Sequence, residues 1–388
     1  MMSKNIVPRI RFKRFNSVWE EDRIADIVKI SAGGDVDKVK LKESGKYPVI
    51  ANALTNKGIV GFYEDYKVKA PAVTVTGRGD VGYAVARHEN FTPIVRLLTL
   101  QSEKIDVDYL ENQINSMRIL NESTGVPQLT APQLGNYKVY HPKIEEQSAI
   151  GTLFRTLDDL LSSYKDNLAN YQSFKATMLS KMFPKAGKTV PEIRLDGFED
   201  EWEKGTIGEF GSFYYGKSAP KWSVTDEATT PCVRYGELYT KFSTKIDKIY
   251  SYTSIPKENL KLSSGNEVLV PRVGENPLDF ANCSWLSLKD VAIGEMISVY
   301  NTPNNPLFIA YYFNAKMRKE FAKRVEGGSV ANLYYTYLEN ISISVPSLPE
   351  QQAIGSYFSN LDNLINSYQE KISQLETLKK KLLQDMFI

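Results

Sequence analysis

IEEQSAIGTLFRTLDDLLSSYKDNLANYQSFKATMLSKMF (144–183) aligns to LPEQQAIGSYFSNLDNLINSYQEKISQLETLKKKLLQDMF (348–387) over the full length of both stretches. A second pair, PRIRFKRFNSVWEEDRIADI (8–27) and PEIRLDGFEDEWEKGTIGEF (191–210), aligns without gaps and opens the two copies. The segments enclosed by these markers differ in length and almost completely in sequence. This self-similarity predicts a duplication, with a repeated frame made of the marker segments and two diverged inserts.

Both long stretches carry an apolar stripe with intervals of 3, 4, 3, 4 and 3 residues at identical offsets. This spacing is typical of a coiled-coil seam and predicts two helices of about 37 residues, roughly 55 Å each. Each helix either packs on its own domain or packs on the other helix, and the identical registers favour mutual packing. A pseudo-twofold axis between the copies then predicts an antiparallel pair. The predicted seam residues are Phe154, Leu157, Leu161, Tyr164, Leu168 and Tyr171 with Phe358, Leu361, Ile365, Tyr368, Ile372 and Leu375.

The inserts combine strand-like and helix-like patterns. Residues 70–87 alternate on both sides of a glycine-rich turn and predict a β-hairpin, and residues 266–286 predict a similar one. Helical periodicity marks residues 107–120 and 308–325. In the second hairpin, Arg272 and Gly274 resemble Arg78 and Gly79 of the first and are matched with them.

We therefore predict a mixed α/β protein, in which two α+β domains are joined by an antiparallel coiled coil and related by an internal pseudo-twofold duplication. The segment PKAGKTVP (184–191) is rich in Pro, Gly and Lys and predicts a link between the copies. The predicted boundaries are 1–143 for the first domain with its frame segment, 144–183 for the first spacer helix, 184–190 for the linker, 191–347 for the second domain with its frame segment, and 348–388 for the second spacer helix.

Composition limits the functional classes. The 388 residues are 42% hydrophobic and 24% charged, which is typical of a globular protein, and no apolar run approaches the roughly 18 residues of a membrane span. Two cysteines and two distant histidines predict neither a disulfide framework nor a metal site, and favour the cytoplasm. The net charge of +2 neither supports nor excludes nucleic-acid binding.

Two glycine motifs match nucleotide-binding patterns without their structural context. GSFYYGKS (211–218) fits the phosphate-binding loop, but Pro220 follows at once and no periodic helix does. GRGDVG (77–82) fits the dinucleotide pattern but leads into a second strand. A hairpin tip is favoured there, and its Arg78 either reaches a nucleic-acid groove or belongs to a plain tight turn. A P-loop ATPase that uses Lys217 is kept as an alternative hypothesis.

The two Arg-x-x-x-Phe-x-x-x-Trp openings, the two E-Q-x-x-I-G helix starts and the two diverged inserts carry a resemblance that covers the whole chain. In these features the chain resembles the specificity subunit of a type I restriction–modification system. The resemblance implies that each insert is a target recognition domain for one half of a bipartite, asymmetric DNA sequence, with the paired helices setting the gap.

The resemblance also implies partners and cofactors. It implies double-stranded DNA, two modification (methyltransferase) subunits and restriction (endonuclease and translocase) subunits as partners, and no membrane. S-adenosylmethionine, ATP and Mg are expected on those partners and none on this chain, which is expected to be non-catalytic. A scaffold protein without a DNA role is the other alternative hypothesis.

Residues for DNA contact are predicted from their type and position. Arg, Lys and Asn in predicted loops or hairpins are the side chains that contact base edges and phosphates. The predicted DNA-binding residues are Asn56, Lys57, Arg78 and Arg87 in the first insert, and Lys217, Lys221, Arg234 and Arg272 in the second.

Overall fold

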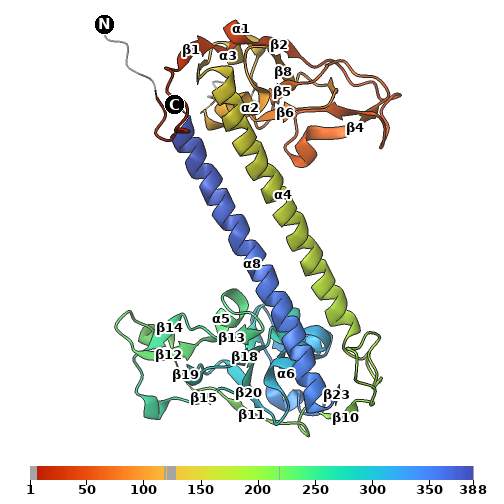
Figure 1. Cartoon of the computed structure of the whole chain (residues 1–388). Coiled ribbons are helices and arrows are strands. Elements are labelled where there is room, and N and C mark those ends of the chain that lie inside the picture. The colour runs from red at the N-terminus through yellow and green to blue at the C-terminus, as the bar shows by residue number, and fades with distance from the viewer. Residues whose placement is uncertain (1–6, 118, 120–127, 218, 388) are drawn as a thin grey trace. The chain divides into compact units, whose positions relative to one another are not determined.

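The computed structural model describes residues 7–117, 119, 128–217 and 219–387, and the chain divides into two compact units. The first unit comprises Met1–Asp166 and Gln369–Ile388, and the second comprises Asn167–Tyr368. Two long helices, α4 (Ile144–Lys181) and α8 (Leu348–Met386), each contribute one end to each unit (Figure 1). No helix among the described residues has an apolar stretch long enough to cross a membrane.

The first unit is built on a four-stranded antiparallel sheet of order β2-β8-β5-β6 and a three-stranded sheet of order β4-β3-β7. Figure 1 shows α2 beside the four-stranded sheet and the beginning of α4. The elements are β1 (Glu20–Arg23), α1 (Ile24–Ile27), β2 (Lys29–Ala32), β3 (Tyr47–Ile50), the 3₁₀ turn η1 (Thr55–Gly58), β4 (Ile59–Tyr63), β5 (Ala72–Val75), β6 (Ala84–Arg87), β7 (Thr92–Pro93), β8 (Leu98–Gln101), α2 (Val107–Ser116), α3 (Ala131–Gly135) and β9 (Lys138–His141).

The second unit has a five-stranded sheet of order β11-β20-β16-β18-β13 and a four-stranded sheet of order β14-β12-β19-β15. The elements up to its central strands are β10 (Glu203–Thr206), β11 (Ser212–Tyr215), the turn η2 (Lys221–Ser223), β12 (Thr230–Val233), α5 (Tyr235–Thr240), β13 (Lys245–Ile246), β14 (Ser251–Thr253), the turn η3 (Lys257–Asn259), β15 (Leu262–Ser264) and β16 (Glu267–Pro271). The remaining elements are β17 (Val273–Gly274), the turn η4 (Pro277–Ala281), β18 (Ser284–Leu286), β19 (Lys289–Ile293), β20 (Ile297–Asn301), α6 (Pro306–Tyr312), a π-helical segment (Phe313–Met317), α7 (Arg318–Ala322), β21 (Glu326–Gly327), β22 (Ala331–Asn332), the turn η6 (Tyr335–Tyr337) and β23 (Ser342–Val345).

The two units share one strand order despite their divergent sequences. The order β2-β8-β5-β6 of the first corresponds to β11-β20-β16-β18 of the second. The registers agree as well, because Ala32 pairs with Leu98 where Tyr215 pairs with Ser298. Strand registers therefore give a position-by-position match that the sequences alone do not.

Both predicted hairpins are present, but the proposed match of Arg272 with Arg78 is wrong by one residue, whereas that of Gly274 with Gly79 agrees with the strand register. β5 pairs antiparallel with β6, and β16 pairs antiparallel with β18. The N–H of Leu129 donates to the Gly77 carbonyl oxygen (2.9 Å), and that of Leu333 donates to the Arg272 carbonyl oxygen (2.8 Å). Arg272 therefore occupies the position of Gly77 and not that of Arg78, whose counterpart is Val273. The hairpin sequences are too dissimilar to fix a register that the third strand determines.

The two predicted insert helices are present, but both end earlier than their periodicity predicts. The first is α2, and residues 118 and 120 of the predicted range lie outside the described residues. The second begins at Pro306, turns π-helical over Phe313–Met317 and ends at Ala322. Asp106 and Asn305 cap the two helices, because their side chains accept the N–H of Tyr109 and Phe308.

The repeated frame motifs join each long helix to its insert. In both units the Gln of the E-Q pair accepts a backbone N–H at the start of the insert helix and donates to the carbonyl of the preceding proline. These bonds are Asp106 N to Gln147 Oε1 (2.9 Å) and Gln147 Nε2 to Pro142 O (2.8 Å), with Asn305 N to Gln351 Oε1 (2.8 Å) and Gln351 Nε2 to Pro346 O (2.8 Å) in the second unit. The duplicated motif is therefore a joint that fixes the insert on the helix.

Within each unit, α4 and α8 run in opposite chain directions. In the first unit Asp158 pairs with Lys379 (2.5 Å) and Lys165 with Glu376 (2.7 Å). In the second unit Lys175 pairs with Asp362, and the rings of Tyr171 and Tyr368 lie 5.4 Å apart. The predicted seam residues given above are all buried or half-buried, with Phe154 and Phe358 fully inside the two domain cores.

Candidate nucleic-acid interface

Three of the four DNA-binding cations predicted in the second unit lie on segments that are hydrogen-bonded to one turn. This turn (294–296) connects β19 to β20, and four backbone hydrogen bonds tie other segments to it or to its flanks. They run from Lys217 N to Ile293 O (2.9 Å), from Gly216 N to Ile297 O (3.0 Å), from Gly294 N to Val233 O (3.0 Å) and from Arg272 N to Met296 O (3.2 Å). Lys217, Arg234 and Arg272 are thus brought together at one end of the sheet, whereas Lys221 lies apart on η2.

The same turn cluster exists in the first unit around residues 94–96. Backbone N–H groups of Val95 and Arg96 donate to the carbonyl oxygens of Gly34 (2.8 Å) and Gly33 (3.0 Å). The Asn52 side chain adds a second link, since its Nδ2 donates to the Val95 carbonyl oxygen (2.6 Å) and its Oδ1 accepts the N–H of residue 77 (2.7 Å). We call these two arrangements the turn clusters of the two units.

Predicted residues Asn56, Lys57 and Arg78 are exposed beside the turn cluster of the first unit. Arg78 follows the residue held by Asn52, and Asn56 and Lys57 lie in η1, four and five residues after Asn52. Both η1 residues have positive φ (48° and 49°), a conformation that an Asn adopts more readily than a Lys. The loop that carries them therefore needs an external support.

Arg87 supplies that support and is not a surface residue. Its side chain is buried, with Nε donating to Thr74 Oγ1 (3.0 Å) and Nη2 to the Lys57 carbonyl oxygen (2.7 Å). Burial lowers the pKa of Arg87 to about 10, and the side chain stays charged at neutral pH. In this geometry Arg87 positions the η1 loop rather than presenting its guanidinium to a ligand.

Sequence reasoning missed Asn52 and Arg96. Arg96 is exposed and has a φ of 59°, which places it at the surface of the turn cluster. It stands inside the apolar stretch PIVRLLTL, whose periodicity indicates only a strand. Asn52 follows a strand in an ordinary loop composition. Neither carried a sequence signal, because their role depends on segments about 25 to 45 residues away.

A groove of about 810 Å³ in the first unit also escaped prediction. Asp108 accepts from both His88 Nε2 (2.8 Å) and Arg155 Nη1 (3.2 Å) there, and burial raises the pKa of Glu111 to about 7. Its carboxylates and cations are close to balance: Asp108, Glu111, Asp158, Asp159 and Glu376 against Lys57, Arg155, Lys165, Lys379 and Lys380. A near-neutral groove does not fit a phosphate backbone, so the turn clusters remain the candidate interface.

Both histidines have carboxylate partners. His88 pairs with Asp108, and His141 Nε2 lies 3.0 Å from Asp22 Oδ2 on the β1–β9 ladder. With Glu20, these two ladder residues form the one group of potential metal ligands found within the described ranges. This group belongs to the frame and lies on neither turn cluster.

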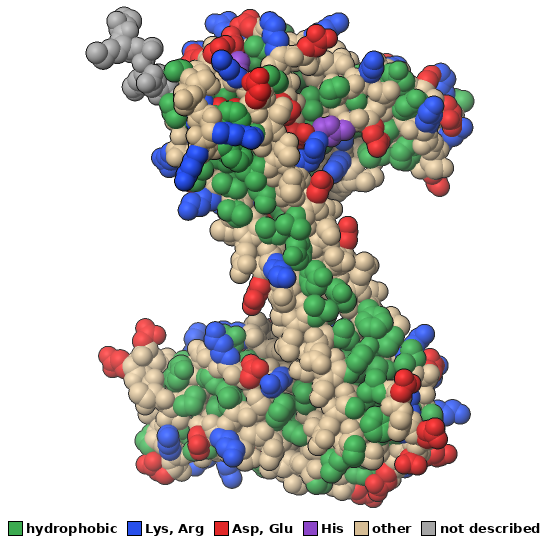
Figure 2. All heavy atoms as spheres, in the orientation of Figure 1, with side chains coloured by type: hydrophobic (Ala, Val, Ile, Leu, Met, Phe, Trp, Pro, Cys, Tyr) green, Lys and Arg blue, Asp and Glu red, His purple; other side chains and the backbone are tan. Residues whose placement is uncertain are grey.

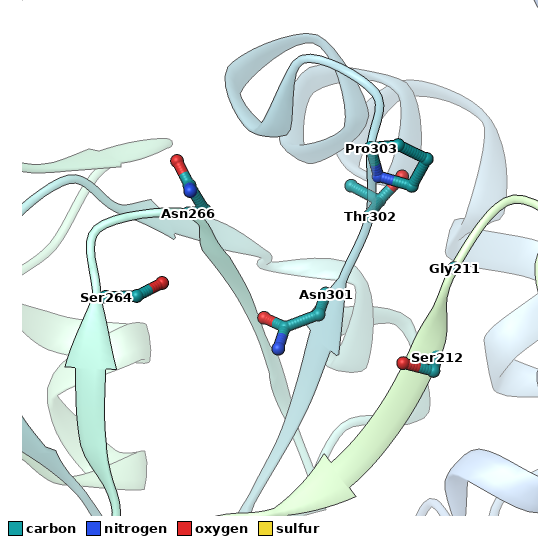
Figure 3. A pocket seen from close by; sticks show the side chains of 7 residues that line it. All are labelled: Gly211, Ser212, Ser264, Asn266, Asn301, Thr302 and Pro303. Carbon is teal, nitrogen blue, oxygen red and sulfur yellow. The ribbon is translucent and has the colours of Figure 1, made fainter.

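The phosphate-loop pattern is a strand. Residues 212–215 form β11, so Gly211 and Gly216 stand at opposite ends of it, and Ser218 lies outside the described residues. A Cβ on Gly216 would lie 2.1 Å from the Gly294 carbonyl oxygen, so the glycine is needed for the close approach of two backbones. Figure 3 shows the hollow of about 360 Å³ at the Gly211 end, whose lining residues are all uncharged. The P-loop ATPase hypothesis is not supported, because the residues between the two glycines form a strand instead of a phosphate-binding loop.

Charge on the surface is mixed. Figure 2 shows Lys and Arg side chains interspersed with Asp and Glu on the visible face of each unit. The chain has a net charge of only +2, and its cations do not gather into one large basic patch on that face. On this face, nucleic-acid contact would depend on local groups of cations rather than on one broad basic surface.

Comparison with known proteins gives one consistent family. The model described as "Type I restriction modification DNA specificity domain" matches residues 16–170 and 199–377. The specificity subunit of the type I restriction enzyme MjaVIII of Methanocaldococcus jannaschii is 22% identical over 94% of this chain and 91% of its own length. A putative type I specificity subunit of Mycoplasma genitalium is 20% identical over 98% of this chain and 97% of its own length. The crystal structure of a type I restriction–modification S subunit from M. genitalium superposes with a TM-score of 0.69 at 16% identity, covering 99% of both chains.

Proposed function

Since the chain belongs to the type I restriction–modification DNA specificity family, we propose that its two turn clusters each read one half of a bipartite DNA target. The chain is a non-catalytic specificity subunit, and DNA target recognition is its role. What the family does not tell is which surface makes the contact.

The observation that carries this proposal is the recurrence of the turn cluster with different side chains. Both units hold several loops around one turn by backbone hydrogen bonds, so the scaffold is shared. The side chains offered by the scaffold differ: Arg78 and Arg96 in the first unit, and Lys217, Arg234 and Arg272 in the second. A constant backbone with variable polar side chains is what two different half-sites require. The target is therefore expected to be asymmetric.

We further propose that α4 and α8 form an antiparallel coiled coil that spaces the two half-sites. Two repeated ion pairs support it. Asp158 and Asp362 stand at the same place in the two copies, as do Lys175 and Lys379, and each Lys of one copy pairs with the Asp of the other. Reciprocal pairing of equivalent residues is the signature of a twofold relation.

Partners of the chain follow from its family. Type I specificity subunits assemble with methyltransferase and restriction subunits and bind DNA. We propose that two modification subunits dock on this chain, one for each copy of the frame, and that S-adenosylmethionine, ATP and Mg are bound by the partners. A cytoplasmic location fits such an assembly.

Methylation-motif mapping in cells that carry this chain with its partner subunits tests the proposal. A bipartite motif with two different halves is expected. Arg78→Ala should weaken binding by about 1–3 kcal/mol and relax one half-site only, because Arg78 belongs to one turn cluster. A motif left intact by Arg78→Ala would remove that residue from the interface.

The scaffold alternative is tested with the reconstituted complex. Binding to duplex DNA should fall steeply with salt, since contacts to phosphates release counterions. A complex that shows no motif in cells and no salt-dependent binding to DNA would contradict the recognition role and leave a scaffold.

A further inference from the structure

Arg272 is held between two tyrosine rings at the turn cluster of the second unit. Its guanidinium carbon lies 4.4 Å from the ring centre of Tyr215 and 5.5 Å from that of Tyr334. Its Nε is buried and has no hydrogen-bond partner within the described part of the chain. We call these three residues the Tyr–Arg–Tyr clamp.

Neighbouring aromatic rings and backbone hydrogen bonds hold the clamp in place. The ring of Tyr215 packs at 4.6 Å against Tyr335, which in turn stacks on Phe213 at 5.4 Å with an interplanar angle of 4°. Both backbone groups of Arg272 are hydrogen-bonded: its N–H donates to the Met296 carbonyl oxygen, and its carbonyl oxygen accepts the N–H of Leu333. Two walls and a fixed backbone leave the guanidinium little freedom, so its plane is set before any ligand arrives.

The fold itself does not need the clamp. Strand registers place Ala32 of the first unit at Tyr215 and Gly77 at Arg272, and Thr130 follows Leu129 as Tyr334 follows Leu333. All three clamp positions therefore carry small side chains in the first unit, on the same strand order. In the first unit the N–H of Gly77 bonds the Asn52 side chain, and in the second unit the N–H of Arg272 bonds the Met296 carbonyl oxygen, so neither link uses the Arg272 side chain. The clamp is thus a property of the surface of the second unit and not of its scaffold.

Resting on the proposed function, we propose that Arg272 reads a guanine in the major groove of the second half-site. With Nε buried, the guanidinium offers its two terminal nitrogens as a fork. That fork matches the O6 and N7 acceptors of guanine, the commonest specific contact of an arginine in the major groove. Aromatic walls that fix the plane of the fork favour a planar base edge over a phosphate, because a phosphate accepts from many directions.

The test uses the chain assembled with its modification subunits. Each guanine of the mapped second half-site is replaced in turn by 7-deazaguanine, which lacks the N7 acceptor. The wild-type complex should lose affinity at one position by part of the about 5- to 150-fold that a full bidentate contact is worth, because the O6 acceptor remains. Arg272→Ala should lose the full factor on the unmodified site and be indifferent to 7-deazaguanine at that position.

Two further variants separate base reading from charge. Arg272→Lys keeps the cation but lacks the fork, so the methylation motif should become degenerate at one G·C pair of the second half-site. Arg318→Ala is the matched control, since it removes an exposed cation of the same unit that pairs with Asp279 (3.5 Å). It should leave the motif unchanged. The intact first half-site reports that every variant complex is folded.

Two results would overturn the inference while leaving the proposed function standing. One is an unchanged motif in Arg272→Ala and Arg272→Lys. The other is a uniform loss of affinity on all sequences with a shallower salt slope, which marks a phosphate contact. A wild-type complex that yields no bipartite motif would instead refute the proposed function.

Discussion

Arg11 and Arg194 show at the residue scale what the repeated opening motif does. Arg11 donates from Nε and Nη2 to the two carboxylate oxygens of Glu146, both at 2.6 Å, and Arg194 makes the same pair with Glu350 (2.8 and 2.7 Å). Both glutamates are buried. The partners are 135 and 156 residues apart in sequence, so the alignment revealed that these residues repeat but not that they meet.

Arg11→Ala should lower the free energy of unfolding of the first unit by about 3–5 kcal/mol, because it leaves the Glu146 carboxylate buried without its partner. Urea denaturation of the purified chain checks this. Arg9→Ala is the control: Arg9 is 85% exposed, its contact with Asp385 spans 3.7 Å, and its loss should cost at most about 1 kcal/mol. Equal effects of the two substitutions would contradict a structural role for the buried pair.

Only some of the residues predicted to contact DNA lie at the candidate interface. The types and loops predicted for Arg78, Lys217 and Arg272 place them at the turn clusters, although their contact with DNA stays a prediction. Arg87 has the same type and lies in the same hairpin, yet it is buried. Sequence cannot separate a surface arginine from one that bonds a carbonyl 30 residues away.

Elements with long periodic signals were predictable, whereas most short strands outside the two predicted hairpins were not. The two helix starts at residues 144 and 348 are those predicted from the sequence. Most strands are only two to five residues long, too short for a reliable alternation. Several pair with strands far along the chain, as β1 does with β9, and such pairing leaves no local pattern.

The helix ends also cross over between the copies. Met386 and Phe387 are the last residues of the second long stretch but lie in the core of the first unit, where Phe387 contacts the rings of Tyr109 (5.3 Å) and Phe154 (5.6 Å). Phe183 holds the equivalent place in the second unit, stacked on Phe358 at 5.8 Å. Each core is therefore completed by the last residues of the other copy.

Phe387→Ala should destabilise the first unit by about 3–5 kcal/mol, since a buried ring is replaced by a cavity. Hydrogen exchange followed by mass spectrometry should show faster exchange in α2, with the second unit unaffected. Phe174→Ala, on an exposed position of α4, is the matched control and should change neither unit. Faster hydrogen exchange in the second unit instead of the first would contradict the placement of Phe387 in the core of the first unit.

At the scale of the whole molecule, the frame and the inserts are under different physical constraints. The frame repeats its ion pair, its glutamine joint and its terminal aromatic residue in both copies, because each of these is needed to hold an insert on a helix. The inserts keep a strand order but not its surface residues. Under the proposed function, exchange of side chains at the turn clusters is therefore expected to alter a half-site and to leave the spacing between the half-sites unchanged.

The two long helices, α4 and α8, are the elements that we propose to set the distance between the two half-sites. Insertion of four residues after Asp166 and after Glu370, which are equivalent positions of the two copies, adds about 6 Å, close to two base-pair steps. The methylation motif should then keep both half-sites and widen its gap by about two base pairs. Replacing four exposed residues at the same places by alanine, without a change of length, should leave the gap as it was. A gap that stays the same after both insertions would show that α4 and α8 do not set the distance between the half-sites.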